Sequence, residues 1–259
     1  MGRFDELVGI VARLRGEGGC PWDRAQSLES MRPYLLEETY EVLDAIDRGE
    51  ELQEELGDLA FQVVFLARLA EEAGRFGMDD VLQRINRKMV DRHPHVFEAG
   101  AVRTGDEGDV AAWEARKARE RGGVGSALDG VPPALPALLR AHRISEKAGA
   151  VGFDWPDAAG VRAKLTEEVA ELDQAMAGGN PIEIAEELGD VLFTLVNLGR
   201  HLPTGAEDAL RMATARFEAR FRVVEAELAA QGRTVYETPA DELEARWRAA
   251  KRAAPLSGG

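Results

Sequence analysis

An acidic pentapeptide, Glu-Glu-Leu-Gly-Asp, occurs at residues 54–58 of this chain and again at 186–190. Each copy follows a second acidic segment, Glu-Glu-x-x-Glu, at 37–41 and 167–171, and each runs directly into an apolar segment. Carboxylates at the start of a buried helix cost free energy unless a positive group lies among them. The leading interpretation is therefore a metal site of oxygen ligands that the chain builds twice.

An internal repeat covers most of the chain. Besides the acidic segments, two pairs of residues recur with their internal spacing unchanged, while the gaps between the pairs differ by a few residues. Such a pattern is typical of aligned helices that are joined by loops of variable length. Residues 121–133 are rich in glycine and proline, so we expect a linker there, between an N-terminal repeat (1–120) and a C-terminal repeat (134–259). The recurring pairs are Lys88 with Arg92, matched by Arg216 with Arg220, and Trp113 with Lys117, matched by Trp247 with Lys251.

The hydrophobic pattern predicts helices throughout. Apolar residues recur at helical spacing in 7–14 and 35–46, and the segments 81–90 and 210–228 are amphipathic. Segment 56–69 is apolar on nearly every side, which indicates burial on several sides. No segment shows the sustained alternation of a strand. We expect an all-α fold of two tandem helical bundles with cores of the four-helix-bundle type. The apolar helices are too hydrophobic for a lone hairpin and need helices from another repeat or subunit, so we also expect a homodimer.

Composition and charge exclude several classes of function. The formal net charge of −15 argues against broad binding to nucleic acid or to an anionic membrane. A small phosphorylated ligand is still compatible, because a bound divalent cation inverts the local field. Cys20 is the only cysteine, which rules out an intrachain disulfide and fits a reducing compartment. No apolar run approaches the roughly 20 residues of a membrane span, and the first residues do not resemble a secretory signal, so we expect a cytoplasmic protein.

The spacing of the acidic residues predicts two groups of four carboxylates. Residues three apart lie on one face of a helix, and two such pairs from successive antiparallel helices can face each other. Carboxylate oxygens are hard ligands that suit Mg²⁺ or Mn²⁺ rather than zinc. A single Glu-x-x-Glu is usually a solvated helix face, but the doubled arrangement beside apolar helices favours a metal site. The first quartet is Glu38, Glu41, Glu55 and Asp58, and the second is Glu168, Glu171, Glu187 and Asp190.

These motifs resemble the signature of the all-α nucleotide pyrophosphohydrolases. Within that group, the chain resembles the two-domain MazG proteins. The matching stretches are Cys-Pro-Trp-Asp at 20–23, the acidic segments with their apolar continuations, Arg-His-Pro-His-Val-Phe at 92–97, Val-Gly-Phe-Asp-Trp at 151–155 and Arg-Phe-Glu-Ala-Arg-Phe at 216–221. The resemblance implies Mg²⁺-dependent hydrolysis of nucleoside triphosphates, ATP among them, to the monophosphate and pyrophosphate. It also implies that Mn²⁺ can replace Mg²⁺, that specificity is broad, and that the role is house-cleaning of the nucleotide pool.

The resemblance also implies roles for residues of the second repeat. The quartet would hold the metal on the triphosphate and lower the pKa of a water aimed at the α-phosphorus. Glu167 or Glu186, less engaged by metal, could take the proton from that water. Arg216 and Arg220 match a Lys/Arg pair of the family that would bind the phosphates. The arginine at 216 replaces the expected lysine, which keeps the charge but changes the donor geometry.

Three further residues have two readings each. Lys164 lies four residues before Glu168, so its ammonium could reach a phosphate or form an ordinary i,i+4 salt bridge. The first repeat has Tyr34 at that position. Trp247 and Lys251 resemble residues that the family places near the nucleotide, although a tryptophan can also be core only, which is the reading we prefer for Trp113.

The sequence leaves open which repeat is catalytic. The resemblance favours the second, and Lys164 supports it modestly, but the first quartet with Lys88 and Arg92 is intact and nothing visible disables it. Three other functions also stay open. They are a narrow-substrate relative that acts on dUTP or phosphoribosyl-ATP, a nucleotide-binding regulatory protein with one or both sites silent, and a purely structural helical protein.

Overall fold

The computed structural model describes residues 2–97 and 125–253, and all secondary structure in these ranges is helical. The prediction of an all-α fold is thus confirmed. The chain forms two compact units, Met1–Arg103 and Thr104–Gly259. The boundaries expected for the repeats and the linker stay predictions, because residues 98–124 lie outside the described part of the chain.

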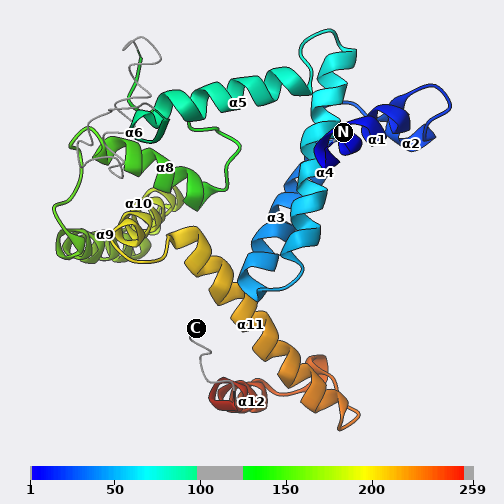
Figure 1. Ribbon diagram of the computed structural model, residues 1–259. Helices are drawn as coiled ribbons and strands as arrows, with labels where there is room; N and C mark the ends of the chain where they lie inside the picture. The colour runs from blue at the N-terminus through cyan, green and yellow to red at the C-terminus, as the bar shows by residue number, and fades with distance from the viewer. Residues whose placement is uncertain (1, 98–124, 254–259) are drawn as a thin grey trace. The chain divides into compact units, whose positions relative to one another are not determined.

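The first unit is built on a helical hairpin of α3 (Arg32–Arg48) and α4 (Leu52–Glu72), which lie side by side in Figure 1. Gly49 ends α3 with a φ of 71°, a left-handed conformation that glycine adopts without steric cost. The turn is short, so the C-terminal part of α3 meets the start of α4. The other helices of this unit are α1 (Arg3–Arg15) on α4, α2 (Pro21–Ala25) on α1, α5 (Met78–Arg92) on α4 and α6 (Pro94–Phe97) after α5.

The core of the first unit fixes one face of α4. The ring of Phe65 is fully buried, and Val64 and Leu69 pack beside it with Val11 of α1. The guanidinium of Arg15 lies 5.2 Å from the centre of the Phe65 ring and ion-pairs with Glu72 at 2.7 Å. With this face anchored on α1, the acidic start of α4 is directed along α3.

The second unit repeats the hairpin with α9 (Ala158–Gly178) and α10 (Pro181–Arg200), which again lie side by side in Figure 1. Gly179, with a φ of 72°, ends α9 as Gly49 ends α3. Asn180 then caps α10 by accepting a hydrogen bond from the backbone N–H of Ile182 at 3.1 Å, and Pro181 occupies the first turn, where its missing N–H costs nothing. The helices that pack on this hairpin are α8 (Ala137–Gly149) and α11 (Ala206–Ala229).

The end of α11 forms a small separate core with α12 (Ala240–Ala253), which follows the 3₁₀ turn η1 (Val235–Glu237). Val224 and Leu228 of α11 are buried against Ala250 of α12. Outside this core, the carboxylate of Glu242 accepts hydrogen bonds from the guanidinium of Arg233 at 2.8 Å and 2.9 Å. These apolar contacts and hydrogen bonds stabilise the packing of α12 against the end of α11.

Both hairpins leave apolar side chains exposed. On α10, Leu188, Leu192 and Leu195 recur at helical spacing and expose 42–47% of their surface. At the matching positions of α4, Leu56 and Val63 are 49% and 41% exposed. Segment 56–69 is therefore buried over only part of its surface by the helices that pack on α4 within this unit. None of the described helices combines the length and the apolar content needed to cross a bilayer.

Candidate active site

Each hairpin brings three carboxylates into one group. Glu38 of α3 meets Glu55 and Asp58 of α4, and these residues are called the first acidic group. In each group, one ligand oxygen per residue lies within 4.8 Å of the others. Three of the four predicted ligands thus meet in each repeat. The second acidic group consists of Glu168 and Glu171 of α9 with Glu187 of α10.

The fourth predicted ligand of each quartet lies outside this tight group. Glu41 is exposed on α3, one turn after Glu38, and Asp190 is exposed on α10, one turn after Glu187. Spacing along a helix places these two residues on the correct face. Their oxygens lie outside the acidic groups because of the side-chain conformations, which residue spacing does not determine.

Burial and like charge dominate the first acidic group. Burial raises the pKa of Glu38, as do the charges of Asp58 and Glu41, while a hydrogen bond from Gln62 opposes the rise. Burial likewise raises the pKa of Glu55, followed by the charges of Glu41 and Asp58. A bound divalent cation would relieve the repulsion between these carboxylates, and their oxygens are suitable ligands for a hard metal ion.

Gln62 is a member of this site that sequence reasoning missed. It is 5% exposed on α4, and its Nε2 donates to Glu38 Oε1 at 3.3 Å. Its Oε1 is buried without a hydrogen-bond partner in the described part of the chain. A signal was present, because Gln62 follows Asp58 by four residues and so lies on the acidic face of α4.

The second acidic group contains a cation. Lys164 Nζ lies 2.7 Å from Glu167 Oε1 and 2.9 Å from Glu168 Oε1, and these hydrogen bonds raise the pKa of Lys164 above its ordinary value. Glu168 is only 6% exposed, so its charge needs such a partner. A hydrogen bond shared with Glu168 raises the pKa of Glu171. Lys164 thus forms salt bridges to Glu167 and Glu168 in this structure, and its contact with a phosphate stays a prediction.

The cations predicted to bind phosphate lie on α11. Arg216 is exposed and Arg220 is half-buried there. Among the described residues, no ion pair joins either arginine to an acidic group. In the first repeat Lys88 is exposed and Arg92 is buried on α5.

The remaining predicted residues divide between α10, α12 and the undescribed part of the chain. Glu186 is exposed on α10, and Lys251 is exposed on α12. Trp247 is half-buried on α12, with its ring centre 4.9 Å from that of Phe217, so it has at least a packing role. Trp113 and Lys117 lie outside the described residues.

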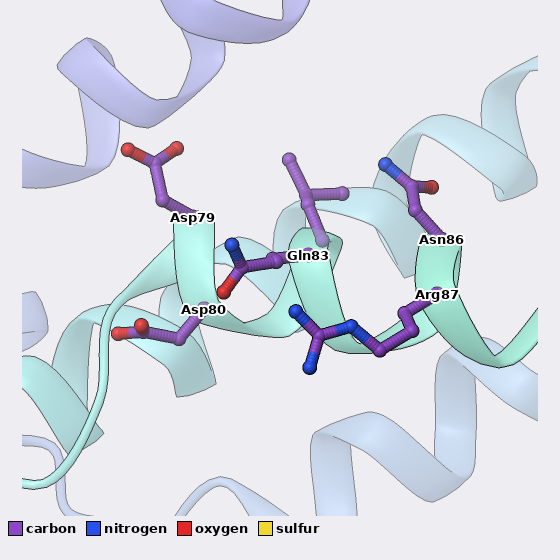
Figure 2. A pocket seen from close by; sticks show the side chains of 6 residues that line it. Asp79, Asp80, Gln83, Asn86 and Arg87 are labelled. Carbon is purple, nitrogen blue, oxygen red and sulfur yellow. The ribbon is translucent and has the colours of Figure 1, made fainter.

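A separate hollow lies along α5, as Figure 2 shows. It contains none of the predicted site residues, so the candidate site is defined by the two acidic groups. The lining residues are Asp79, Asp80, Leu82, Gln83, Asn86 and Arg87.

Comparison with known proteins agrees with this geometry. The model of the MazG nucleotide pyrophosphohydrolase domain matches residues 26–97 and 158–223, the two stretches that hold the hairpins. The chain is 45% identical over 259 residues to the nucleoside triphosphate pyrophosphohydrolase of Escherichia coli K12, covering 97% of this chain and 98% of that protein. It is 44% identical to the nucleoside triphosphate pyrophosphohydrolase/pyrophosphatase MazG of Thermotoga maritima, covering 96% and 95%.

A longer relative shows the same match over part of its length. The chain is 39% identical to the uncharacterized protein YabN of Bacillus subtilis, covering 96% of this chain and 51% of that protein. Two matched stretches, each with a helical hairpin that carries three converging carboxylates, account for the internal repeat found in the sequence. The chain belongs to the MazG nucleotide pyrophosphohydrolase family.

Proposed function

We propose that this chain hydrolyses nucleoside triphosphates to the monophosphate and pyrophosphate, and that the second acidic group is the main catalytic site. The observation that carries the proposal is the convergence of Glu168, Glu171 and Glu187 from two helices in a chain whose relatives are named for this activity. Sites of this kind act by positioning the phosphates and by stabilising their charge.

The residues fit a divalent cation, which we propose to be Mg²⁺ with Mn²⁺ as a substitute. The three converging carboxylates would hold it, with Asp190 one helical turn away on α10. When bound, the ion neutralises charge on the phosphates and lowers the pKa of a nucleophilic water. The exposed carboxylates of Glu167 and Glu186 are the candidates to accept the proton as the water oxygen bonds to the α-phosphorus and pyrophosphate leaves.

Positive side chains of the second unit are proposed to bind the phosphates. The ammonium of Lys164 already lies at the acidic group, and Arg216 and Arg220 occupy neighbouring turns of α11, which packs on α10. Lys251 and Trp247 of α12 are proposed to contact the nucleotide. The first acidic group, with Lys88, Arg92, Trp113 and Lys117, is the second and less active site in this proposal.

Broad specificity and a role in cleansing the nucleotide pool complete the proposal. The net charge of −15 supports a small-molecule substrate rather than nucleic acid. A cytoplasmic location and the absence of a membrane partner stay predictions. Assays on a panel of normal and damaged triphosphates, with dUTP and phosphoribosyl-ATP included, would separate a broad enzyme from a narrow one.

We further propose that the chain is a homodimer. The exposed stripe of Leu188, Leu192 and Leu195 on α10 has a counterpart in Leu56 and Val63 on α4. Apolar faces of this kind, on helices that carry the acidic groups, are typical of surfaces that a further helix pair covers. A second copy of the chain would supply such helices.

The pair Asp190→Asn and Asp58→Asn tests which acidic group is catalytic. Asp190 is proposed as the fourth ligand, one turn after Glu187, and loss of a ligand removes several kcal/mol of transition-state stabilisation, so Asp190→Asn should lower kcat/KM by about a hundredfold or more. Asp58→Asn should leave most hydrolysis intact. The measurement is pyrophosphate release with Mg²⁺ under matched conditions. Equal losses in the two variants would contradict the assignment to the second group, and no release by the wild type would contradict the activity itself.

A further inference from the structure

The two acidic groups differ in how they balance their charge. Lys164 Nζ contacts the buried Glu168 at 2.9 Å and Glu167 at 2.7 Å, so one of the three converging carboxylates is already paired with a cation. A buried carboxylate left without a partner is strongly destabilising, so this ion pair supports the fold of the metal-free chain.

The first acidic group has no such cation at the matching position. Tyr34 stands there, 37% exposed, with its ring centre 5.6 Å from that of Trp22 in an edge-to-face contact. Glu38 instead accepts a hydrogen bond from the neutral amide of Gln62. The neighbouring charges that perturb Glu38 and Glu55 are acidic in both cases.

We propose that Lys164 is a resident counter-ion of the second acidic group. This group then binds a divalent cation tightly only when nucleotide phosphates draw the ammonium away from Glu168, whereas the first acidic group binds the free cation. The proposal rests on the proposed function, because it assumes that both groups hold metal and that the second one receives the triphosphate.

Charge and geometry support this division. A divalent ion among the oxygens of Glu168, Glu171 and Glu187 would lie close to the ammonium of Lys164, and the repulsion is appreciable at the modest effective dielectric of a half-buried site. The lysine stem is flexible and its head is a point charge with three donors, so it can turn from a carboxylate to a phosphate oxygen. The nucleotide would then bring its own negative charge as Lys164 leaves Glu168.

Counting bound Mn²⁺ on the full chain by electron paramagnetic resonance tests the proposal, with and without α,β-methylene-ATP. The wild type should bind one Mn²⁺ tightly per chain without the analogue and a second only with it. Glu55→Gln should remove the first ion, and Glu187→Gln the second. Lys164→Met should let the second group bind Mn²⁺ about tenfold more tightly without the analogue, because one nearby positive charge is gone.

Two further variants control for charge and for folding. Arg162→Met removes one positive charge from the exposed side of the same helix and should change neither affinity. Tyr34→Lys should weaken Mn²⁺ binding at the first group about tenfold by adding the missing cation. Circular dichroism should show that each variant keeps its helices.

The outcomes separate this proposal from the proposed function. Two ions bound equally tightly by the wild type without the analogue, or an unchanged affinity in folded Lys164→Met, would overturn the counter-ion role while hydrolysis persisted. Failure of Glu187→Gln to remove any ion, together with no pyrophosphate release by the wild type, would instead refute the proposed metal site and the activity.

Discussion

At the scale of single residues, the crowded carboxylates of the first acidic group make a prediction about stability. Burial and neighbouring charge raise the pKa of Glu55, so its ionised form destabilises the fold above that pKa, and the effect vanishes as the pH falls below the unfolded value of about 4.5. Glu55→Gln should therefore raise the melting temperature of the chelator-treated chain at pH 8 but not at pH 4. It should also abolish the stabilisation by Mg²⁺. Glu17→Gln, which removes an exposed charge in the same unit, should do neither.

Residue spacing predicts which carboxylates share a face but not which cation or amide pairs with them. The i,i+3 rule predicted that Glu38 and Glu41 would face Glu55 and Asp58, and in the structure Glu38, Glu55 and Asp58 come together while Glu41 lies outside the tight group. The two readings of Lys164 could not be separated from sequence, because a four-residue spacing allows both a salt bridge and a phosphate contact. Gln62 was not predicted as a site residue, because a single amide within an apolar segment gives no sign that it is buried and bonded to a carboxylate.

At the scale of elements, the hydrogen bonds of Glu242 predict that acid weakens the packing of α12 against the end of α11. The guanidinium groups of Arg233 and Arg246 lower the pKa of Glu242 to about 2. A lowered pKa stabilises the fold above the unfolded value of about 4.5, and this contribution is lost as the pH falls towards 2. Glu242→Gln should therefore loosen α12 at pH 7 and have no effect near pH 2, as measured by hydrogen exchange of its amides.

A matched control lies two residues away on the same helix. Glu244 pairs with Arg248 at 2.8 Å, but both side chains are more than half exposed, and surface pairs of this kind contribute little. Glu244→Gln should leave hydrogen exchange almost unchanged at every pH. If Glu244→Gln loosened α12 as much as Glu242→Gln does, the loosening would be caused by the change in net charge and not by loss of the hydrogen bonds between Glu242 and the two arginines, Arg233 and Arg246.

The helices themselves were largely predictable, because glycine and proline mark their ends. Gly49 and Gly179 end the first helix of each hairpin in a left-handed conformation, and Pro181 opens α10. The amphipathic patterns over 81–90 and 210–228 lie within α5 and α11, as expected. The separate core of α11 and α12 was not predictable, because helical periodicity shows that a face is apolar but not which helix covers it.

At the scale of the whole molecule, the duplicated apolar stripe predicts self-association. Leu188, Leu192 and Leu195 of α10 expose 42–47% of their surface, on the helix that supplies Glu187 to the second acidic group. If a second copy covers this stripe, sedimentation equilibrium should give a dimer. Leu192→Glu should shift it to monomer, because a charge at the centre of an apolar interface loses its hydration. Gln174→Glu, which adds the same charge at an exposed polar position of α9, should leave the dimer intact. A wild-type chain that sediments as a monomer at all concentrations would contradict the dimer and would point to the other repeat as the cover for the stripe.

The same variant makes a prediction about activity, because α10 also supplies Glu187. Hydrolysis by Leu192→Glu should decrease in proportion to the fraction of dimer, while its helix content, measured by circular dichroism on the same samples, stays unchanged.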